Sequence, residues 1–206
     1  LTLIHAPLSN LLKNLPDQSP MYPTLHNVLK QSKRMKDLLN MVLNLRKMEM
    51  TENKVNLGSY LLNEWVKEVG NDFSYEEQEQ NISLRYELDH RIGKVDFDKE
   101  KHLIILTNLI VNAFKHSTPN SIIILRTELT DEEKSVRISV IDQGCGLSNV
   151  DLSKLFTRFY QGKNEKEGSG IGLSYAKILV EQHHGTIGAR NNKEPVSYTH
   201  LTLPTT

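Results

Sequence analysis

The sequence predicts an α+β protein. A helical hairpin in residues 1–50, expected to dimerise into a four-helix bundle, precedes an α/β sandwich with its helices on one face of the sheet. Two observations lead to this prediction. Residues 1–50 carry two apolar seams of helical spacing that prolines separate. From residue 53 on, helical patterns and neighbouring strand patterns follow each other in the order typical of a helix-covered antiparallel sheet.

Composition and charge restrict the class of protein. The 206 residues suffice for one ordinary domain with a smaller appendage, and 38% hydrophobic with 24% charged residues is a globular balance. Lysine plus arginine and aspartate plus glutamate both number 25, so the chain has no bulk positive charge and we expect no direct nucleic-acid contact. Apolar runs such as 122–125 are too short to span a bilayer. Cys145 is the single cysteine, which excludes an internal disulfide and indicates a reducing, cytoplasmic setting.

The two seams of residues 1–50 have a/d spacing. The first consists of Leu1, Ile4, Leu8, Leu11 and Leu15, and the second of Leu25, Val28, Met35, Leu39 and Val42. Pro16, Pro20 and Pro23 mark the turn between them, because proline is poorly tolerated inside a helix. Leu38 and Leu45 widen the second stripe beyond what one partner helix can cover, so we expect a dimer. A hairpin packed on the rest of the same chain is the alternative.

The sequence predicts a succession of helices and strands in the rest of the chain. Asp98 is a good cap for a helix, and the alternation of apolar residues marks the strands. The expected elements are a short strand at 54–57, a helix at 59–73, a loop at 75–80, a strand around 82–86, a helix from 98 to about 116, strands at 121–129 and 135–141, a helix from about 172 to 184 and a strand near 186–189.

One face of the predicted helix 98–116 carries polar side chains. Asn108 and Asn112 are one turn apart, and Lys115 and His116 come next on the same side. An asparagine carbonyl can bind Mg²⁺, and a lysine one turn further can meet the charge of a phosphate. Taken alone, two asparagines on one helix face more often belong to a solvated face than to a binding site.

A carboxylate follows the predicted strand 135–141. The apolar residues of this strand alternate, and Asp142 continues their phase, so its carboxylate is expected to point inward. An inward carboxylate needs a partner, and an adenine amino group is a suitable donor. Gly144 and Gly146 let the backbone turn closely past a flat base. An ordinary Asp-Gly turn is the alternative.

Glycines open the predicted helix that ends near residue 184. Gly168, Gly170 and Gly172 leave backbone N–H groups accessible to phosphate at the positive helix end. The preceding run 162–167 is charged and loop-like rather than a strand, which argues against a dinucleotide fold and for a mobile lid over phosphates. Arg158, flanked by aromatic residues, either reaches a phosphate or belongs to a loop anchored on the core.

Four motifs therefore succeed one another along the chain. They are Asn108-x-x-x-Asn112-Ala113-x-Lys115-His116, Asp142-x-Gly144-x-Gly146, Phe156-x-Arg158-Phe159 and Gly168-x-Gly170-x-Gly172. This order resembles the N, G1, F and G2 boxes of sensor histidine kinases, and the resemblance covers nearly the whole chain. Residues 1–50 look like the dimerisation and phosphotransfer hairpin, and 55–195 like the ATP-binding domain of the Bergerat (GHKL) fold. In detail the motifs look most like the hybrid two-component kinases of the Bacteroidetes.

The resemblance implies a function and the residues for it. Asn112 would bind Mg²⁺, Lys115 and Arg158 would meet the phosphates of ATP, Asp142 would bind the adenine, and residues 162–170 would form the ATP lid. The implied catalytic residues are Asn108, Asn112, Lys115 and Arg158. The implied nucleotide-binding residues are Asn112, Lys115, His116, Asp142, Gly144, Gly146, Phe159, Gly168, Gly170, Gly172 and Leu173.

The family also implies a reaction and partners. The complete enzyme would be an inner-membrane sensor whose cytoplasmic portion includes this chain and forms a homodimer through residues 1–50. It would transfer the ATP γ-phosphoryl group to a histidine and then to an aspartate of a response-regulator receiver domain.

Two stretches depart from the family pattern. The family's acceptor histidine lies in His-Glu-x-Arg-Thr-Pro-Leu, and residues 1–4 match the segment directly after that motif, so the acceptor is expected upstream of Leu1. His5 lacks the acidic neighbour, the arginine and the threonine, and is not expected to be the acceptor. Residues 196–206 keep the closing Leu-Pro but lack the glycine and aromatics of the family's last strand, so they are suspected to be foreign sequence.

Two other functions fit parts of the pattern. One is another ATPase of the same fold, a chaperone or topoisomerase relative. Those hydrolases resemble one another in placing a glutamate four residues before the metal asparagine, as the base for the attacking water. Asn108 stands there in this chain, so hydrolysis lacks its base. The other is a non-catalytic module that binds ATP and dimerises.

Overall fold

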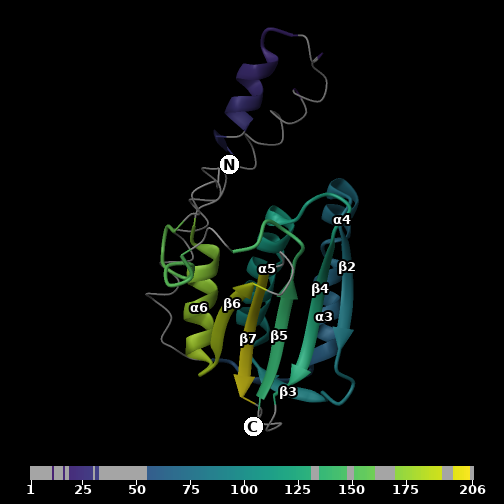
Figure 1. The fold of residues 1–206 in the computed structure, drawn as a ribbon, viewed down its shortest axis with the longest axis vertical. Helices are drawn as coiled ribbons and strands as arrows, with labels where there is room; N and C mark the ends of the chain where they lie inside the picture. Colours follow the sequence, from purple (N-terminus) through teal and green to yellow (C-terminus); the bar gives the residue numbers. More distant parts are fainter. Residues whose placement is uncertain are drawn as a thin grey trace. The chain divides into compact units, whose positions relative to one another are not determined.

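The computed structural model describes residues 11, 16, 19–29, 31–32, 55–130, 135–147, 151–160, 170–191 and 197–204. The chain divides into two compact units, Leu1–Glu52 and Asn53–Thr206. In the first unit, residues 22–29 form a helix after a turn at residues 20–21 (Figure 1). The proline turn therefore ends before Pro23, which lies in the first helical turn, where a missing N–H costs no intrahelical bond. Most of both apolar seams falls outside the described residues, so the helical hairpin bundle is not evident and stays a prediction.

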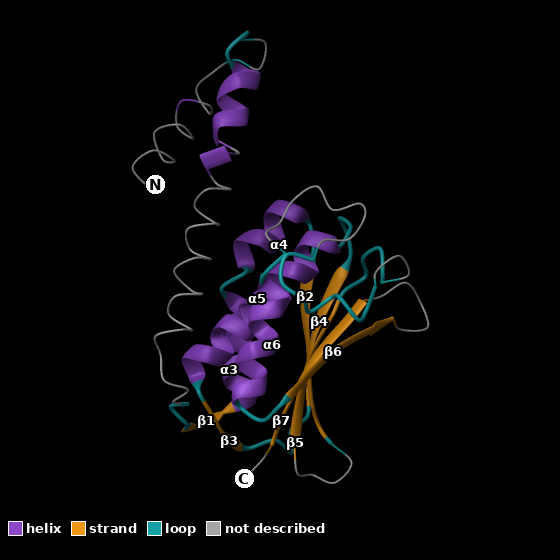
Figure 2. Ribbon diagram, turned by 90° about the vertical axis from the view of Figure 1, so that its left-hand side faces the viewer, coloured by secondary structure: helices purple, strands orange, loops and turns teal. Residues whose placement is uncertain are grey.

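The second unit is an α/β sandwich with helices on one face of a sheet (Figure 2). The sheet has five strands in the order β2-β4-β5-β7-β6, and β1 and β3 form a separate two-stranded sheet. Among the described strands of the larger sheet, the β2–β4 pair is parallel and the other pairs are antiparallel. The elements are β1 (Gly58–Leu61), α3 (Leu62–Asn71), α4 (Ser74–Gln80), β2 (Ser83–Leu88), β3 (Lys94–Phe97), α5 (Lys99–His116), β4 (Ile122–Leu129), β5 (Ser135–Ile141), α6 (Gly172–Gln182), β6 (Thr186–Asn191) and β7 (Ser197–Pro204).

The core lies between the helices and the inward face of the sheet. Alternate residues of β4 and β5 are buried, as the period of two in their sequences predicts. The fully buried side chains include Leu62 and Val66 of α3, Ile105, Leu106 and Ile110 of α5, and Ile123, Leu125 and Ile138 of the sheet. No helix among the described residues is long and apolar enough to cross a bilayer.

Asp98 caps α5, which confirms the helix start predicted from the sequence. Its Oδ1 accepts a hydrogen bond of 3.0 Å from the backbone N–H of Lys101, and its Oδ2 accepts one of 3.0 Å from the N–H of Asn56. Burial of the carboxyl raises its pKa, but the N–H groups of Lys101 and Asn56 favour the charged form, and the net pKa is lowered. The same side chain thus starts the longest described helix and ties down the segment before β1.

The predicted loop at 75–80 is wrong, because these residues belong to helix α4. Glu76 and Glu77 lie in its first turn, where negative charge complements the helix dipole. Asn81 ends the helix in the left-handed conformation with a φ of 53°. No residue of α4 is buried, so its sequence has no apolar stripe to distinguish an exposed helix from a loop.

The elements around residue 60 also differ from the prediction. The strand expected at 54–57 is β1, Gly58–Leu61, and the helix expected from residue 59 begins at Leu62. Strand β1 pairs antiparallel with β3, with Gly58 opposite Phe97, and β3 was not expected. The position of β1 depends on a partner strand that is distant in sequence, so the residues around position 58 alone do not predict its bounds.

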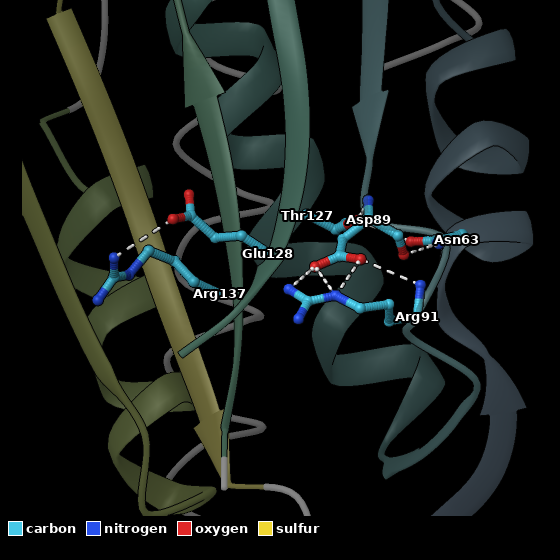
Figure 3. A network of polar contacts seen from close by, with 6 residues as sticks. All are labelled: Asn63, Asp89, Arg91, Thr127, Glu128 and Arg137. Atoms are coloured by element: carbon cyan, nitrogen blue, oxygen red, sulfur yellow. Dashed lines mark hydrogen bonds and ion pairs between the residues drawn. The ribbon is translucent and has the colours of Figure 1, made fainter. Parts of the chain in front are cut away.

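A polar network ties α3 to the end of β2 and to β4 (Figure 3). The Asn63 amide donates to the Asp89 carbonyl over 2.9 Å, and the Thr127 hydroxyl donates to Asn63 Oδ1 over 2.7 Å. The Asp89 N–H donates in turn to Thr127 Oγ1 over 3.2 Å. The Arg91 guanidinium binds both oxygens of the Asp89 carboxylate and holds its pKa well below the usual range. This network fixes the end of the sheet at which β4 finishes.

Strand β7 lies between β5 and β6 and pairs antiparallel with both. Ser135 of β5 is opposite Pro204, and Thr186 of β6 is opposite Thr202. Backbone pairing of this kind is open to almost any sequence, since each residue other than proline carries one donor and one acceptor. The pairing therefore does not bear on the origin of residues 196–206, and the domain limit at residue 195 stays a prediction.

Candidate nucleotide-binding site

The C-terminal half of α5 presents the predicted polar face. Asn108, Asn112 and His116 are half-buried, and Lys115 is exposed. The Asn108 amide donates from Nδ2 to the Ile104 carbonyl over 2.8 Å, within the helix. This bond fixes the orientation of the Asn108 amide, and its Oδ1 faces Gly172 at the start of α6.

Two glycines shape the start of α6. A Cβ on Gly172 would lie 2.7 Å from Asn108 Oδ1, so a residue without a side chain is needed where α6 approaches α5. Gly170 has a φ of 66°, and a Cβ there would lie 2.7 Å from the Tyr160 carbonyl oxygen. Residue Ile171, the N-cap of α6, makes no side-chain capping hydrogen bond. Among the described residues, no side-chain hydrogen bond from the N-cap caps the first N–H groups of α6, and a helix end of this kind can bind an anion.

The turn after β5 holds a buried carboxylate. Asp142 is 4% exposed, as its phase in the strand predicts, and its Oδ1 accepts from the Gly144 N–H over 2.9 Å. Gly144 also forms an isolated β-bridge with Ser117, and a Cβ on it would overlap the His116 carbonyl oxygen. Gly146 has a φ of 68°, in the left-handed region. The turn therefore lies directly against the end of α5.

Phe159 of the F motif lies beside Gly170. Phe159 is 63% exposed and has a φ of 64°, and its N–H donates to the Gly170 carbonyl over 2.9 Å. Arg158 is exposed. Leu173 is partly buried and packs against the hydrophobic core. Gly168 and most of the predicted lid, residues 162–170, lie outside the described residues.

The structure thus brings three separate segments together. Asn108 joins α5 to Gly172 of α6, and His116 joins α5 to Gly144 of the turn. A buried carboxylate and an uncapped helix N-terminus consequently flank the polar face of α5. The described residues contain no group of three or more His, Cys, Asp or Glu side chains that could hold a metal.

Sequence reasoning missed two side chains of this region. Gln143 Oε1 accepts from the Ile122 N–H over 2.9 Å, and Asn191 Oδ1 accepts from the Leu147 N–H over 2.7 Å. Gln143 occupies the unassigned position between Asp142 and Gly144, and Asn191 ends β6. Their partners are 21 and 44 residues away, so no local pattern could have predicted these contacts.

Comparison with known proteins identifies the class of this domain. Residues 98–206 match the family model described as histidine kinase-, DNA gyrase B-, and HSP90-like ATPase, and the chain belongs to this family. Over 211 residues it is 29% identical to "Histidine kinase P4" of Formosa agariphila, which covers 99% of this chain and 15% of that protein. Within the ATPase family, the domain is that of a sensor histidine kinase, as the order of the motifs predicts. The particular likeness to Bacteroidetes kinases has weak support from the Formosa relative and from "Sensor protein RprX" of Bacteroides fragilis, 26% identical over 166 residues, which are 78% of this chain and 32% of that protein. "Sensor histidine kinase WalK" of Bacillus subtilis is 32% identical over 131 residues, which are 62% of this chain and 21% of that protein.

Solved structures show the same fold. Full-length ShkA in complex with AMPPNP superposes with a TM-score of 0.76 and 20% identity, covering 98% of this chain and 44% of that one. The histidine kinase ThkA, solved in complex with the response regulator TrrA, gives a TM-score of 0.73 and 22% identity, covering 100% of this chain and 57% of that one. The GHKL fold predicted for the second unit is therefore confirmed.

Proposed function

We propose that this chain supplies the ATP-binding, phosphoryl-donating part of a two-component histidine kinase. The observation that carries the proposal is the convergence of the α5 polar face, the buried Asp142 and the uncapped start of α6 in one site. The chain spans 15% of the length of its Formosa relative, so the activity of the whole protein is part of the proposal.

The nucleotide is proposed to lie across the three segments. Asp142, held by the Gly144 N–H, accepts a hydrogen bond from the adenine amino group. The N-terminus of α6 and the cations Lys115 and Arg158 bind the phosphates. Asn112 offers its amide oxygen to Mg²⁺, which neutralises phosphate charge when bound. The AMPPNP complex of ShkA supports a nucleotide in this fold.

The proposed reaction is phosphoryl transfer to histidine. An imidazole nitrogen attacks the γ-phosphorus, the bond from that phosphorus to the β,γ-bridging oxygen breaks, and ADP leaves. The residues named above contribute positioning and charge neutralisation rather than acid–base chemistry. An aspartate of a receiver domain then takes the phosphoryl group, and the complex of ThkA with TrrA supports a response regulator as partner. The relatives that are sensor kinases support a place in the cytoplasmic portion of an inner-membrane sensor.

ATP hydrolysis by this site is less well supported. Asn108 stands where a hydrolase of this fold would carry its glutamate base, and its amide is bound to the Ile104 carbonyl. Neither an amide nitrogen nor an amide oxygen in this arrangement can take a proton from water.

Replacing Asn112 by alanine is expected to remove most of the Mg²⁺-dependent part of ATP affinity. Loss of a metal-coordinating oxygen should weaken Mg·ATP binding by about tenfold or more, while binding of ATP without Mg²⁺ stays as in the wild type. Calorimetry with and without Mg²⁺ measures both values. Asn71→Ala, at the exposed end of α3, is the matched control. Wild-type affinity of folded Asn112→Ala for Mg·ATP would show that this helix face is structural.

Residues 1–50 are proposed to hold a homodimer together. Their two apolar seams are wider than one hairpin can cover, so the whole chain should be a dimer and residues 55–206 a monomer. Light scattering on both chains measures the masses. A monomeric whole chain, or a dimer that survives removal of the hairpin, would contradict the four-helix bundle.

A further inference from the structure

The turn that presents Asp142 is held at both ends by side chains outside the predicted nucleotide contacts. At its start, Gln143 Oε1 accepts from the N–H of Ile122, the first residue of β4, over 2.9 Å. Just beyond the second glycine, the N–H of Leu147 donates over 2.7 Å to Oδ1 of Asn191, the last residue of β6. The turn is thus fastened to two strands that lie on opposite sides of β5 in the sheet order.

This turn needs anchors, because its own sequence restrains it weakly. Gly144 and Gly146 lie within it, and glycine leaves the backbone more conformational freedom than any other residue. The Asp142 carboxylate is buried, and its Oδ1 is bound to the N–H of Gly144 inside the same turn. A change of the backbone at 144–147 therefore moves a partner of the carboxylate.

We propose that Asn191 and Gln143 are positioning residues that preorganise the turn for adenine, a proposal that rests on the proposed function of this site. Neither side chain needs to touch the nucleotide. Gln143 binds the N–H of Ile122 and Asn191 binds the N–H of Leu147. The turn held in this way keeps the Asp142 carboxylate at the position where it contacts the adenine. Their loss reduces affinity for the adenine end of a nucleotide and leaves the phosphate end, formed by α5 and α6, unchanged.

The test compares two probes on the whole chain. Asn191→Ala and Gln143→Ala should each raise the Kd of Mg·ADP about three- to tenfold, the effect of one hydrogen bond, while the Kd of Mg·tripolyphosphate stays constant. Asn191→Asp and Gln143→Glu keep an oxygen acceptor at the same place and should restore the wild-type Kd of Mg·ADP. If Asn191 and Gln143 only stabilised the fold, their loss would change the Kd of Mg·ADP and the Kd of Mg·tripolyphosphate alike.

Asn63→Ala is the matched control. It also removes a side-chain hydrogen bond to the backbone, that to the Asp89 carbonyl, together with the one that Asn63 accepts from Thr127, but at the end of the sheet where β4 finishes (Figure 3). It should lower the melting temperature and leave both Kd values unchanged. A Kd of Mg·ADP that rises as much in Asn63→Ala as in Asn191→Ala would overturn the proposal, because the effect would then follow stability rather than position.

Hydrogen exchange on the wild type tests the same idea without any substitution. The amides of Leu147 and Ile122 should be protected before nucleotide is added, and fast exchange at both would overturn the proposal. Folded alanine variants with wild-type Kd for Mg·ADP, or with equal losses for the two probes, would also overturn it and leave the proposed function standing. A wild-type chain that binds neither probe would overturn the proposed function and this inference together.

Discussion

Replacing Asp142 by alanine is expected to weaken binding of ATP and ADP by roughly 10- to 150-fold, which corresponds to the 1.5–3 kcal/mol of a hydrogen bond to a charged group. The carboxylate is 4% exposed, so water cannot readily take its place beside the adenine amino group. Calorimetry on the purified variant measures the loss. The loss should be the same with and without Mg²⁺, because the carboxylate is proposed to meet the base and not the metal.

Two further variants separate binding from folding. Asp142→Asn retains an oxygen that can accept from the Gly144 N–H, so it should keep the turn. Its amide nitrogen replaces the second carboxylate oxygen by a donor, so it should still weaken the hydrogen bond from the adenine amino group. Asp72→Ala removes an exposed aspartate at the end of α3 and should bind ADP as the wild type does. If Asp142→Ala folds and binds ADP with unchanged affinity, adenine is not read by this carboxylate.

The elements that were predictable from the sequence are those fixed by local chemistry. Strands β4 and β5 follow from the alternation of apolar residues, and α5 follows from the Asp98 cap and a long apolar stripe. Asp142 is buried because it continues the phase of β5, which the sequence alone shows. Each of these signals lies within one helix or strand and needs no distant partner.

The parts that were missed depend on partners far along the chain. Strand β3 is short, and its pairing with β1 joins residues as distant as Gly58 and Phe97. The contact between Asn191 and Leu147 exists only once β6 lies in the sheet. The close approach of Gly172 to Asn108 could be suspected from the glycine, but its reason, an amide oxygen on another helix, appears only in the folded structure.

Two buried histidines pack against each other where α5 meets the end of α6. Their titration provides a test of this packing. The rings of His102 and His183 lie edge to face, 4.4 Å apart between centroids. The Nδ1 of His102 donates to the Asp98 carbonyl over 2.9 Å, and that of His183 to the Leu179 carbonyl over 2.7 Å, because a carbonyl can only accept. Both Nε2 atoms are buried and lack a hydrogen-bond partner among the described residues. The pair is therefore built for the neutral form of both rings.

The electrostatics of the pair favour this neutral form. Burial is the largest cause that lowers the pKa of His102, the neighbouring His183 and Lys101 act in the same direction, and Asp98 partly opposes them, so that the pKa is about 4. Burial also lowers the pKa of His183, with Lys101 and His184 acting in the same direction and Asp98 against it. A charge on either ring would have to be accommodated where α5 meets the end of α6, the two helices of the proposed nucleotide site.

The free energy of unfolding is expected to fall as the pH drops from about 6.5 toward 4. A histidine whose pKa is lowered by folding contributes its full stability above its unfolded pKa, near 6.5, and loses it as protons bind the unfolded state preferentially. For His102 the difference between about 6.5 and about 4 amounts to about 3 kcal/mol of lost stability at pH 4. Urea titrations at pH 7 and pH 4 measure the free energy of unfolding at each pH.

In His102→Leu the difference between the free energies of unfolding at pH 7 and pH 4 should shrink by about that amount. His90→Leu replaces an exposed histidine outside the pair and should retain the loss caused by the pair. Should the leucine variant not fold, titration of the His102 ring followed by NMR in the wild type gives the same answer, and a ring that protonates near pH 6.5 in the folded protein would contradict this explanation.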